Sequence, residues 1–572
     1  MIRISRGVSL GLGLLALTGC GAPPAPAPPK AVKMAAQSEQ LGRIVERYWA
    51  EHLVTDEAVS PQLLADSLNI ERRYLAEVDG IPRDGLDSSS RLTYDIFKTE
   101  RELAIEGFTF PAELLPIDPF RGVPQQFAAL AADAAEHPPT SAAGYDGWLR
   151  GIGAYVGWTQ QAITNMREGM RRGYTSPRAL VERMLPILER LGEGGSGNVF
   201  YEPLRAMPAS IKEPDRSRLT NVISAAIAEK LLPANRALHD FLQNEYLPKA
   251  RVGIALSDLP LGARWYAYRI KRASSSRLTA DEIHRIGIAE VERIGAHMPQ
   301  PRDAIGGNVP GAAAPAAAAP LAAQELLNGY RELAATVRAA IPGLFAETPT
   351  GELDIRAAVW LSEPAAPLFY QPAGPAGNPP AVLYVNAGAA PRAVSISNFL
   401  MQAVPGRYYQ IAIQQEHIDL PRFRRFGAVA AFTDGWGLYS ALQGEQLGLN
   451  PAAADKLDAA AAEMRCAVAL VVDTGLHAKG WTRPQALDYL HGHLSIDDID
   501  AQSLIDGYAA NPADALACKM GEMKFQMLRS RAQQQLADRF DVREFHSQIL
   551  KDGAMPLDIL EAKMNVWMAA SR

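Results

Sequence analysis

The sequence lacks several features that would assign it to common functional classes. It has only three cysteines in 572 residues and no Cys-x-x-Cys pair, which excludes a zinc ribbon. Its formal net charge is −6 and it has no basic segment, which argues against a nucleic-acid partner. Its Gly-x-Ser-x-Gly match, residues 7–11, lies in the N-terminal apolar run and not in the body of the chain, so a serine hydrolase triad is not predicted. Two long uncharged stretches, 304–324 and 364–391, are interrupted by prolines and glycines, and we therefore predict no transmembrane helix.

The first twenty residues have the composition of an export signal for a lipid-anchored protein. Arg3 and Arg6 form a short positive region, and residues 7–17 are apolar. Leu17-Thr-Gly-Cys20 then matches the bacterial lipobox, in which the cysteine receives a diacylglyceryl thioether and acyl chains such as palmitate. An ordinary signal peptide with an incidental cysteine is the alternative.

We predict that residues 1–20 are a signal peptide and that Cys20 anchors the mature chain to a membrane. The Pro/Ala-rich segment 21–37 is predicted to be an extended tether, because prolines prevent such a segment from packing. Ala22 stands close to the lipid site, where an aspartate would favour retention in the inner membrane. In a Gram-negative cell we therefore expect the protein in the cell envelope, at the outer membrane and facing the periplasm.

The remaining chain, residues 38–572, is predicted to be one large, mainly α body. Ser176-Pro177 is typical of a helix start, and apolar residues then recur at helical spacing over 180–191. Pro186 is expected to kink that helix or to end it early. Capping boxes predict two further helix starts, at Thr279 with Glu282 and at Thr482 with Gln485.

The sequence also predicts a small β-sheet and one insertion. Residues 356–361 and 381–386 are short runs with strand composition. Residues 306–320 form an Ala/Pro/Gly-rich run that we interpret as a surface insertion. Cys466 and Cys518 would form a disulfide in an oxidising compartment, and two buried free thiols are the alternative.

A series of short segments runs through the body in a fixed order. They are 91–97 (RLTYDIF), 246–251 (YLPKAR), 279–284 (TADEIH), 473–477 (DTGLH) and 545–546 (FH), with Pro405-Gly406 and Gly435-Trp436 between them. Together they resemble the bacterial Domain of Unknown Function 885 family, whose members are exported, helix-rich proteins similar to zinc metallopeptidases. The resemblance spans nearly the whole body. It implies a large helical metallopeptidase-like fold with a central cleft.

The chain departs from this family at the chemical centre. The family has His-Glu-x-x-Pro-Gly-His, followed later by Glu-Gly-Trp. Here Met401 and Arg407 stand at the two histidine positions, and Gln402 stands at the first glutamate position. Asp434 stands at the position of the later glutamate, and Cys518 where the family usually has a tyrosine.

These substitutions remove the donors that a catalytic zinc needs. A thioether such as Met401 suits soft metals, and the guanidinium of Arg407 has no lone pair to offer. Gln402 cannot accept a proton as a general base, and Asp434 alone makes no tetrahedral site. We therefore predict that zinc is absent and that the chain is a pseudoenzyme. We expect Arg407 to fill the space of the lost metal and to pair with Asp434, since an unpaired buried charge is costly.

Six residues retained from the family pattern are predicted to line the cleft: Tyr408, Trp436, Tyr439, Asp473, His477 and Trp481. Asp473 and His477 are four residues apart, which on a helix lets the carboxylate orient the imidazole. A purely structural hydrogen bond is the alternative for this pair. For the aromatic residues the alternative is ordinary core packing.

The expected function is non-catalytic binding of a peptide or of an envelope protein partner. An active peptidase or hydrolase with a non-standard site is the alternative, so enzymatic activity is left open. A structural lipoprotein whose cleft has closed is a third interpretation. Zinc content and chelator-sensitive hydrolysis distinguish the first interpretation from the second.

Overall fold

The computed structural model describes residues 29–52, 58–135, 137–298, 323–357, 368–375, 377, 380–386, 394–449 and 453–571. The fold is mainly α-helical with one small sheet, as the sequence predicts. The predicted signal peptide with Cys20, residues 21–28 of the predicted tether and the insertion 306–320 lie outside the described residues. Within these ranges, no helix has both the length and the apolar character needed to cross a membrane.

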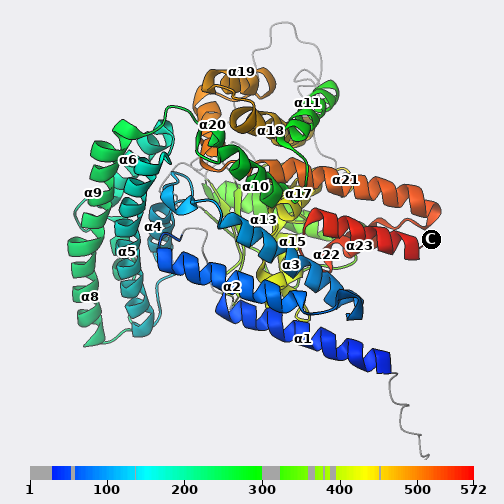
Figure 1. The fold of residues 1–572 in the computed structure, drawn as a ribbon, viewed down its shortest axis with the longest axis horizontal. Coiled ribbons are helices and arrows are strands. Elements are labelled where there is room, and N and C mark those ends of the chain that lie inside the picture. Colours follow the sequence, from blue (N-terminus) through cyan, green and yellow to red (C-terminus); the bar gives the residue numbers. More distant parts are fainter. Residues whose placement is uncertain are drawn as a thin grey trace, which may run out of the picture.

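Three N-terminal helices form one side of the molecule (Figure 1). They are α1 (Pro29–Glu51), α2 (Pro61–Asp79) and α3 (Ser88–Gly107). Because α1 begins at Pro29, residues 29–37 are helical and not extended, which corrects the predicted C-terminal part of the tether. Proline is tolerated in a first helical turn, and the Ala, Lys, Met and Gln residues that follow are good helix formers.

A separate bundle of upright helices flanks the centre (Figure 1). Its helices are α4 (Val123–Asp133), α5 (Ala142–Arg172), α6 (Arg178–Gly192), α7 (Glu202–Arg205), α8 (Asp215–Ala226) and α9 (Leu232–Phe241). The helix α6 continues through Pro186, so the prediction that it ends early is wrong. Pro186 is exposed, so the carbonyl that loses its partner faces water, while Met184 and Leu188 keep the opposite face buried.

The sheet contains three short strands, β1 (Asp354–Ala357), β2 (Leu368–Gln371) and β3 (Val382–Val385), in the order β1-β3-β2. β1 runs parallel to β3 with Asp354 opposite Val382, and β2 runs antiparallel with Leu368 opposite Val385. β3 lies within the predicted run 381–386. β1 shares only Arg356 and Ala357 with the predicted run 356–361, whose residues 358–361 lie outside the described ones. The sequence analysis missed β2, whose four residues stand between Pro367 and Pro372.

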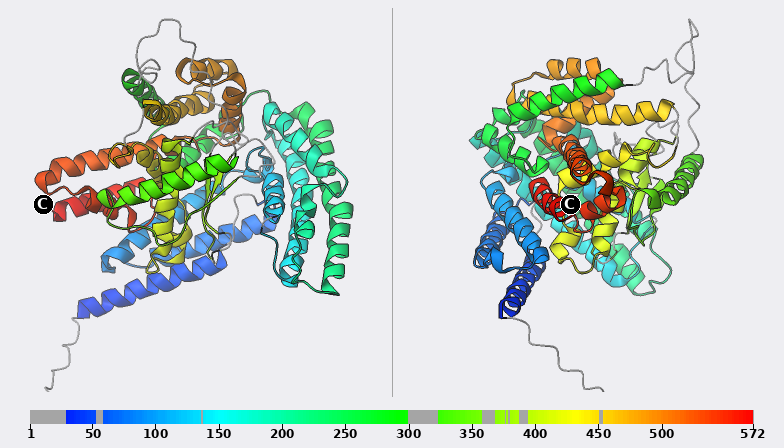
Figure 2. Two further views of the ribbon diagram at one scale, coloured as in Figure 1. Left: turned by 180° about the vertical axis from the view of Figure 1, so that it is seen from behind. Right: turned by 90° about the vertical axis from the view of Figure 1, so that its right-hand side faces the viewer.

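The remaining helices build the centre and an upper layer (Figures 1 and 2). The upper layer contains α11 (Ala280–His297), α18 (Ala453–Ala478), α19 (Arg483–His493) and α20 (Asp498–Ala510). The centre contains α10 (Gly262–Ser274), α13 (Ala323–Ala340), α14 (Ile396–Gln402), α15 (Arg407–Glu416), α16 (Arg422–Phe426), α17 (Ala430–Ala441), α21 (Leu516–Leu536), α22 (Val542–Leu550) and α23 (Leu557–Ala570). Both predicted capping boxes are confirmed, at the starts of α11 and α19.

The largest apolar core lies at the centre and is shared by the sheet, the N-terminal helices and α13 to α17 with α21 to α23. The four substituted positions of the family pattern are on α14, α15 and α17, so they are placed by this core. The candidate site is therefore built on rigid elements.

Candidate functional site

The turn between α14 and α15 is shaped by Pro405 and Gly406. A Cβ atom on Gly406 would lie 2.1 Å from the carbonyl oxygen of Met401, so no larger residue fits there. The carbonyl oxygen of Pro405 accepts hydrogen bonds from Trp436 Nε1 at 2.8 Å and from Ser440 Oγ at 3.3 Å. The retained Pro-Gly and Gly-Trp residues thus fasten this turn to α17.

A glycine-to-glycine crossing fixes α17 against α21. A Cβ on Gly435 would lie 2.3 Å from the Cα of Gly521, and one on Gly521 would lie 1.8 Å from the carbonyl oxygen of Ala431. Only two glycines permit backbones to approach this closely. The crossing sets the position of the residue before it, Asp434.

Arg407 and Asp434 form an ion pair at the centre, as the hypothesis of opposite charges predicts. Arg407 Nη2 bonds to Asp434 Oδ1, and the two side chains are 32% and 28% exposed, so solvent reaches the pair. The surrounding protein raises the pKa of Asp434 by burial, and the nearby carboxylate of Asp514 raises it further. The charge of Arg407 opposes this rise in the pKa.

Met401 lies beside this pair, and Gln402 follows it in the chain. A Cβ atom on Gly437 would lie 3.2 Å from Met401 Cγ and 3.3 Å from Arg407 Cγ. The side chains of Met401 and Arg407 therefore lie against the same residue of α17. Gln402 Oε1 is buried and has no hydrogen-bond partner in the described part of the chain.

The donors at this centre do not fit zinc. A guanidinium supplies no lone pair and repels a second cation, and a thioether is a poor zinc ligand. Over the described ranges, no group of three or more His, Cys, Asp or Glu side chains is arranged to hold a metal ion.

Three of the four aromatic residues predicted to line the cleft are buried in the core. Tyr408 donates its hydroxyl to the carbonyl of Gly351, and Trp436 donates to Pro405 as described above. Tyr439 is fully buried and packs against Trp436 with ring centroids 5.3 Å apart. These three side chains thus pack within the core, and their predicted role in lining a cleft stays a prediction.

A buried chain of hydrogen bonds lies next to Trp436 and was not predicted from the sequence. Arg529 Nη1 donates to the hydroxyl of Tyr439 at 3.0 Å, and that hydroxyl bonds to His546 Nε2 at 2.8 Å. His546 Nδ1 bonds to the carbonyl oxygen of Leu344 at 2.8 Å. Since a carbonyl only accepts, Nδ1 carries the proton and Nε2 accepts from Tyr439. Burial lowers the pKa of His546 to about 4 and raises that of Tyr439 to about 12.

Asp473 and His477 are fully buried on α18, where they bond to other elements and not to each other. Asp473 accepts from Tyr266 and from the backbone of Ala513. His477 Nδ1 accepts from the backbone N–H of Leu256 at 2.9 Å, and Nε2 donates to a backbone carbonyl on α20. The alternative of structural hydrogen bonds thus describes this pair.

Burial shifts the pKa values of these two side chains in opposite directions. It raises the pKa of Asp473 to about 7 and lowers that of His477 to about 3. The hydrogen-bond partners named above all belong to this chain, and neither side chain is exposed to solvent. Trp481, the sixth predicted residue, is partly exposed and packs against Gly475, where a Cβ would lie 2.5 Å from the indole.

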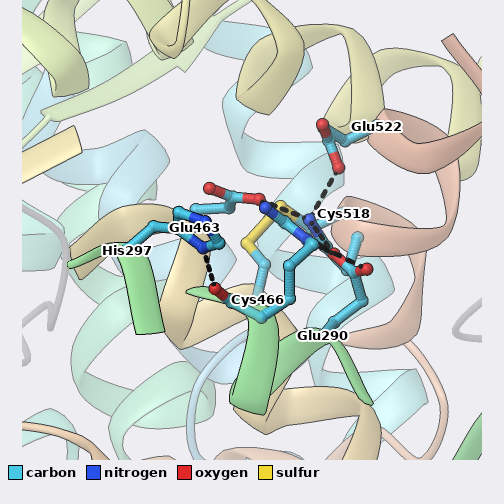
Figure 3. A network of polar contacts seen from close by, with 8 residues as sticks. Glu290, His297, Glu463, Cys466, Cys518 and Glu522 are labelled. Atoms are coloured by element: carbon cyan, nitrogen blue, oxygen red, sulfur yellow. Dashed lines mark hydrogen bonds and ion pairs between the residues drawn. A yellow bond between two sulfur atoms is a disulfide. The ribbon is translucent and has the colours of Figure 1, made fainter. Parts of the chain in front are cut away.

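A second polar cluster joins α11, α18 and α21 (Figure 3). Lys519 Nζ lies 3.0 Å from Glu290, 2.7 Å from Glu463 and 2.8 Å from Glu522, and its side chain is 1% exposed. Arg293 adds a second cation by pairing with Glu290 at 2.8 Å. We call this set of five residues the three-helix junction. The sequence analysis missed it because its acidic members come from three separate helices.

A disulfide between Cys466 and Cys518 lies at this junction, with the Cα atoms 5.9 Å apart (Figure 3). The structure thus selects the disulfide over two free thiols. The bond links α18 to α21 one turn from the Gly435–Gly521 crossing. Cys518 stands at the position where the resembled family usually has a tyrosine.

Comparison with known proteins supports the fold and the family. Residues 37–564 match the model of the family described as "Bacterial protein of unknown function (DUF885)". No curated protein matches the chain.

Two solved structures are similar over nearly the whole chain. A protein from Colwellia psychrerythraea, described as a candidate lipoprotein, is 22% identical with a TM-score of 0.81, and the match covers 95% of this chain and 100% of that one. A candidate lipoprotein of unknown function from Shewanella oneidensis is 15% identical with a TM-score of 0.60, covering 94% and 100%. At these identities the likeness establishes the fold alone.

Proposed function

The chain belongs to the DUF885 family of bacterial proteins of unknown function, and on that premise we propose that it is a lipid-anchored envelope protein that binds a peptide or a protein partner without hydrolysing it. The observation that carries this proposal is the Arg407–Asp434 ion pair. It stands at two positions that the family resemblance assigns to the metal site. A permanent cation there takes the electrostatic role of the metal but cannot activate water.

The surroundings of this pair support binding without hydrolysis. Gln402 has a neutral amide where a general base would be needed, and its buried Oε1 is an unused acceptor. The backbone N–H of a bound peptide is a suitable donor for it. The partial exposure of Arg407 and Asp434 gives such a ligand access to the charges.

The membrane anchor is part of the same proposal. The lipobox ending at Cys20 and the description of both similar structures as candidate lipoproteins support it. We propose the outer membrane, facing the periplasm, as the location, because Ala22 is not the aspartate that favours retention.

Metal analysis of the purified mature protein tests the loss of the zinc mechanism. We expect far less than one zinc per chain and no chelator-sensitive hydrolysis of a mixed peptide library. Stoichiometric zinc would overturn the proposal. Hydrolysis that persists in chelator would favour the alternative, a hydrolase with a non-standard site.

A restored variant provides the matched control. It carries the family residues at all four positions: Met401→His, Gln402→Glu, Arg407→His and Asp434→Glu. Because the turn and the glycine crossing are retained, we expect this variant to bind zinc while the natural protein does not. Equal zinc content in both proteins would show that the ion pair does not decide metal binding.

A further inference from the structure

Two loops near the centre hold residues other than glycine in the left-handed backbone conformation. Leu261 has φ of 59° and Ala513 has φ of 70°. A Cβ atom makes this conformation unfavourable, so it persists only where the surroundings impose it. Ala513 lies in the loop between α20 and α21, directly before Asp514.

The backbone N–H of Ala513 bonds to the side chain of Asp473. Both carboxylate oxygens of Asp473 accept from the backbone N–H of Ala513 at 3.1 Å, and Tyr266 donates its hydroxyl to Oδ1 at 2.5 Å. All three bonds are buried, so water does not compete for them. One turn along α18, His477 holds Leu256 at the start of the other loop in the same way.

The loop that bonds to Asp473 contains a charged residue, Asp514. Asp514 Oδ2 bonds to Arg121 at 2.8 Å and its Oδ1 bonds to Arg269 at 2.9 Å. Arg269 also donates to the carbonyl of Pro512 at 3.1 Å, which ties this residue to the same loop. We call Asp514, Arg121 and Arg269 the charged rim. Asp514 precedes Gly521 by seven residues, and Gly521 packs against Gly435, the residue next to Asp434. This crossing brings the rim toward the Arg407–Asp434 pair, where Asp514 raises the pKa of Asp434 and Arg121 lowers it.

We propose that Asp473 is a positioning residue of the binding site, which holds Ala513 in its left-handed conformation and thereby places the charged rim beside the Arg407–Asp434 pair. The inference rests on the proposed function, because it makes the rim part of the same site. It gives Asp473 a role that is distinct from the orientation of His477. It also makes the charge around Asp434 dependent on a loop that comes from another part of the chain.

The first test is the exchange rate of the Ala513 amide in the natural protein, measured by hydrogen–deuterium exchange. We expect protection comparable to that of α18, because the N–H is bonded to a buried carboxylate. Exchange as fast as in an exposed loop would overturn the proposal without any variant.

The second test compares Asp473→Ala with Asp473→Asn. The alanine variant loses the acceptor, so we expect exchange at Ala513 to rise by about tenfold or more. The asparagine variant keeps one oxygen for the N–H of Ala513 and should stay close to the natural rate. Equal rates in the two variants would contradict the proposal.

The third test measures the pKa of the Asp434 carboxyl by carbon NMR, because this pKa responds to the charged rim. The variant Asp434→Asn identifies the signal. In Asp473→Ala we expect the pKa of Asp434 to fall toward its value in Asp514→Asn, because both variants withdraw the same negative charge. In Asp473→Asn it should not change. An unchanged Asp434 titration in the alanine variant would overturn the proposal. None of these measurements uses a peptide, so failure to bind peptides would count against the proposed function alone.

Discussion

The Arg407–Asp434 pair and the three-helix junction are both built from opposite charges, but their environments differ. The central pair is a single contact with about a third of each side chain exposed. At the junction one buried ammonium contacts three carboxylates, and a disulfide lies next to it. The junction thus has the character of a stabilising element, whereas the two charges at the centre are partly exposed to solvent.

The largest effect should follow from removing the cation of the junction. Lys519→Met leaves three carboxylates without their shared partner, and we expect a loss of about 3–5 kcal/mol in the free energy of unfolding. Lys524→Met on the same helix is the matched control, because Lys524 forms a partly exposed pair with Glu561. Chemical denaturation should show a small change for the control, on the order of 1 kcal/mol or less. Similar losses in both variants would remove the distinction between the two regions.

Loss of the disulfide should come next. Cys466 and Cys518 are 52 residues apart, and we expect the double serine variant to lose about 2–4 kcal/mol of stability. The natural protein in a strong reductant should melt at the same temperature as this variant. A melting temperature that responds to neither change would show that the charged cluster alone holds the junction.

Acidification should weaken the buried chain of hydrogen bonds next to Trp436. The folded pKa of His546 is about 4, below its value near 6.5 in the unfolded chain, so the unfolded state binds the extra proton first. Stability from this group is complete above pH 6.5 and falls by about 3 kcal/mol as the pH drops to 4. His477 acts in the same direction, while Asp473, whose pKa is raised to about 7, opposes it over the whole of this range.

The variant His546→Gln separates this contribution from the others. Glutamine can bond to Leu344 and Tyr439 but does not titrate, so its unfolding free energy should depend less steeply on pH between 6.5 and 4. Parallel curves for the natural protein and the variant would assign the pH dependence to other groups.

The smallest effect is expected at the central pair. Arg407→Met should cost about 1 kcal/mol or less, because solvent screens the pair and hydrates Asp434 once it is alone. The measurement is again denaturant unfolding, with Asp434→Asn as the reciprocal change. A loss as large as that of Lys519→Met would show that the centre is a structural element.

The sequence predicted features that depend on local pattern or on the family resemblance. The two capping boxes and the β1 and β3 strands follow from local spacing, and the Arg407–Asp434 contact follows from opposite charges at positions that the resemblance brings together. The junction was not predictable in this way. Glu290, Glu463 and Lys519 come from three helices, and only the packing of those helices makes them neighbours.

Burial was the second property that the sequence did not reveal. Tyr439 and Asp473 carry polar groups, which is typical both of a cleft and of a satisfied core. The difference depends on whether partners such as His546 and Ala513 are within reach, and these residues are distant in the sequence. In the same way, β2 is too short and too closely bounded by prolines to be recognised without its neighbour β3.

For a chain anchored by a lipid at Cys20, the position at which α1 begins limits the distance between the folded body and the membrane. If Cys20 carries the lipid, only residues 21–28 separate the anchor from the first helix, and eight residues can extend no more than about 30 Å. The folded body is then confined to a thin layer above the bilayer. A soluble ligand must diffuse into that layer, whereas a partner held in the same leaflet is already concentrated within it, so this short connection favours partners at the membrane surface over soluble targets farther from it.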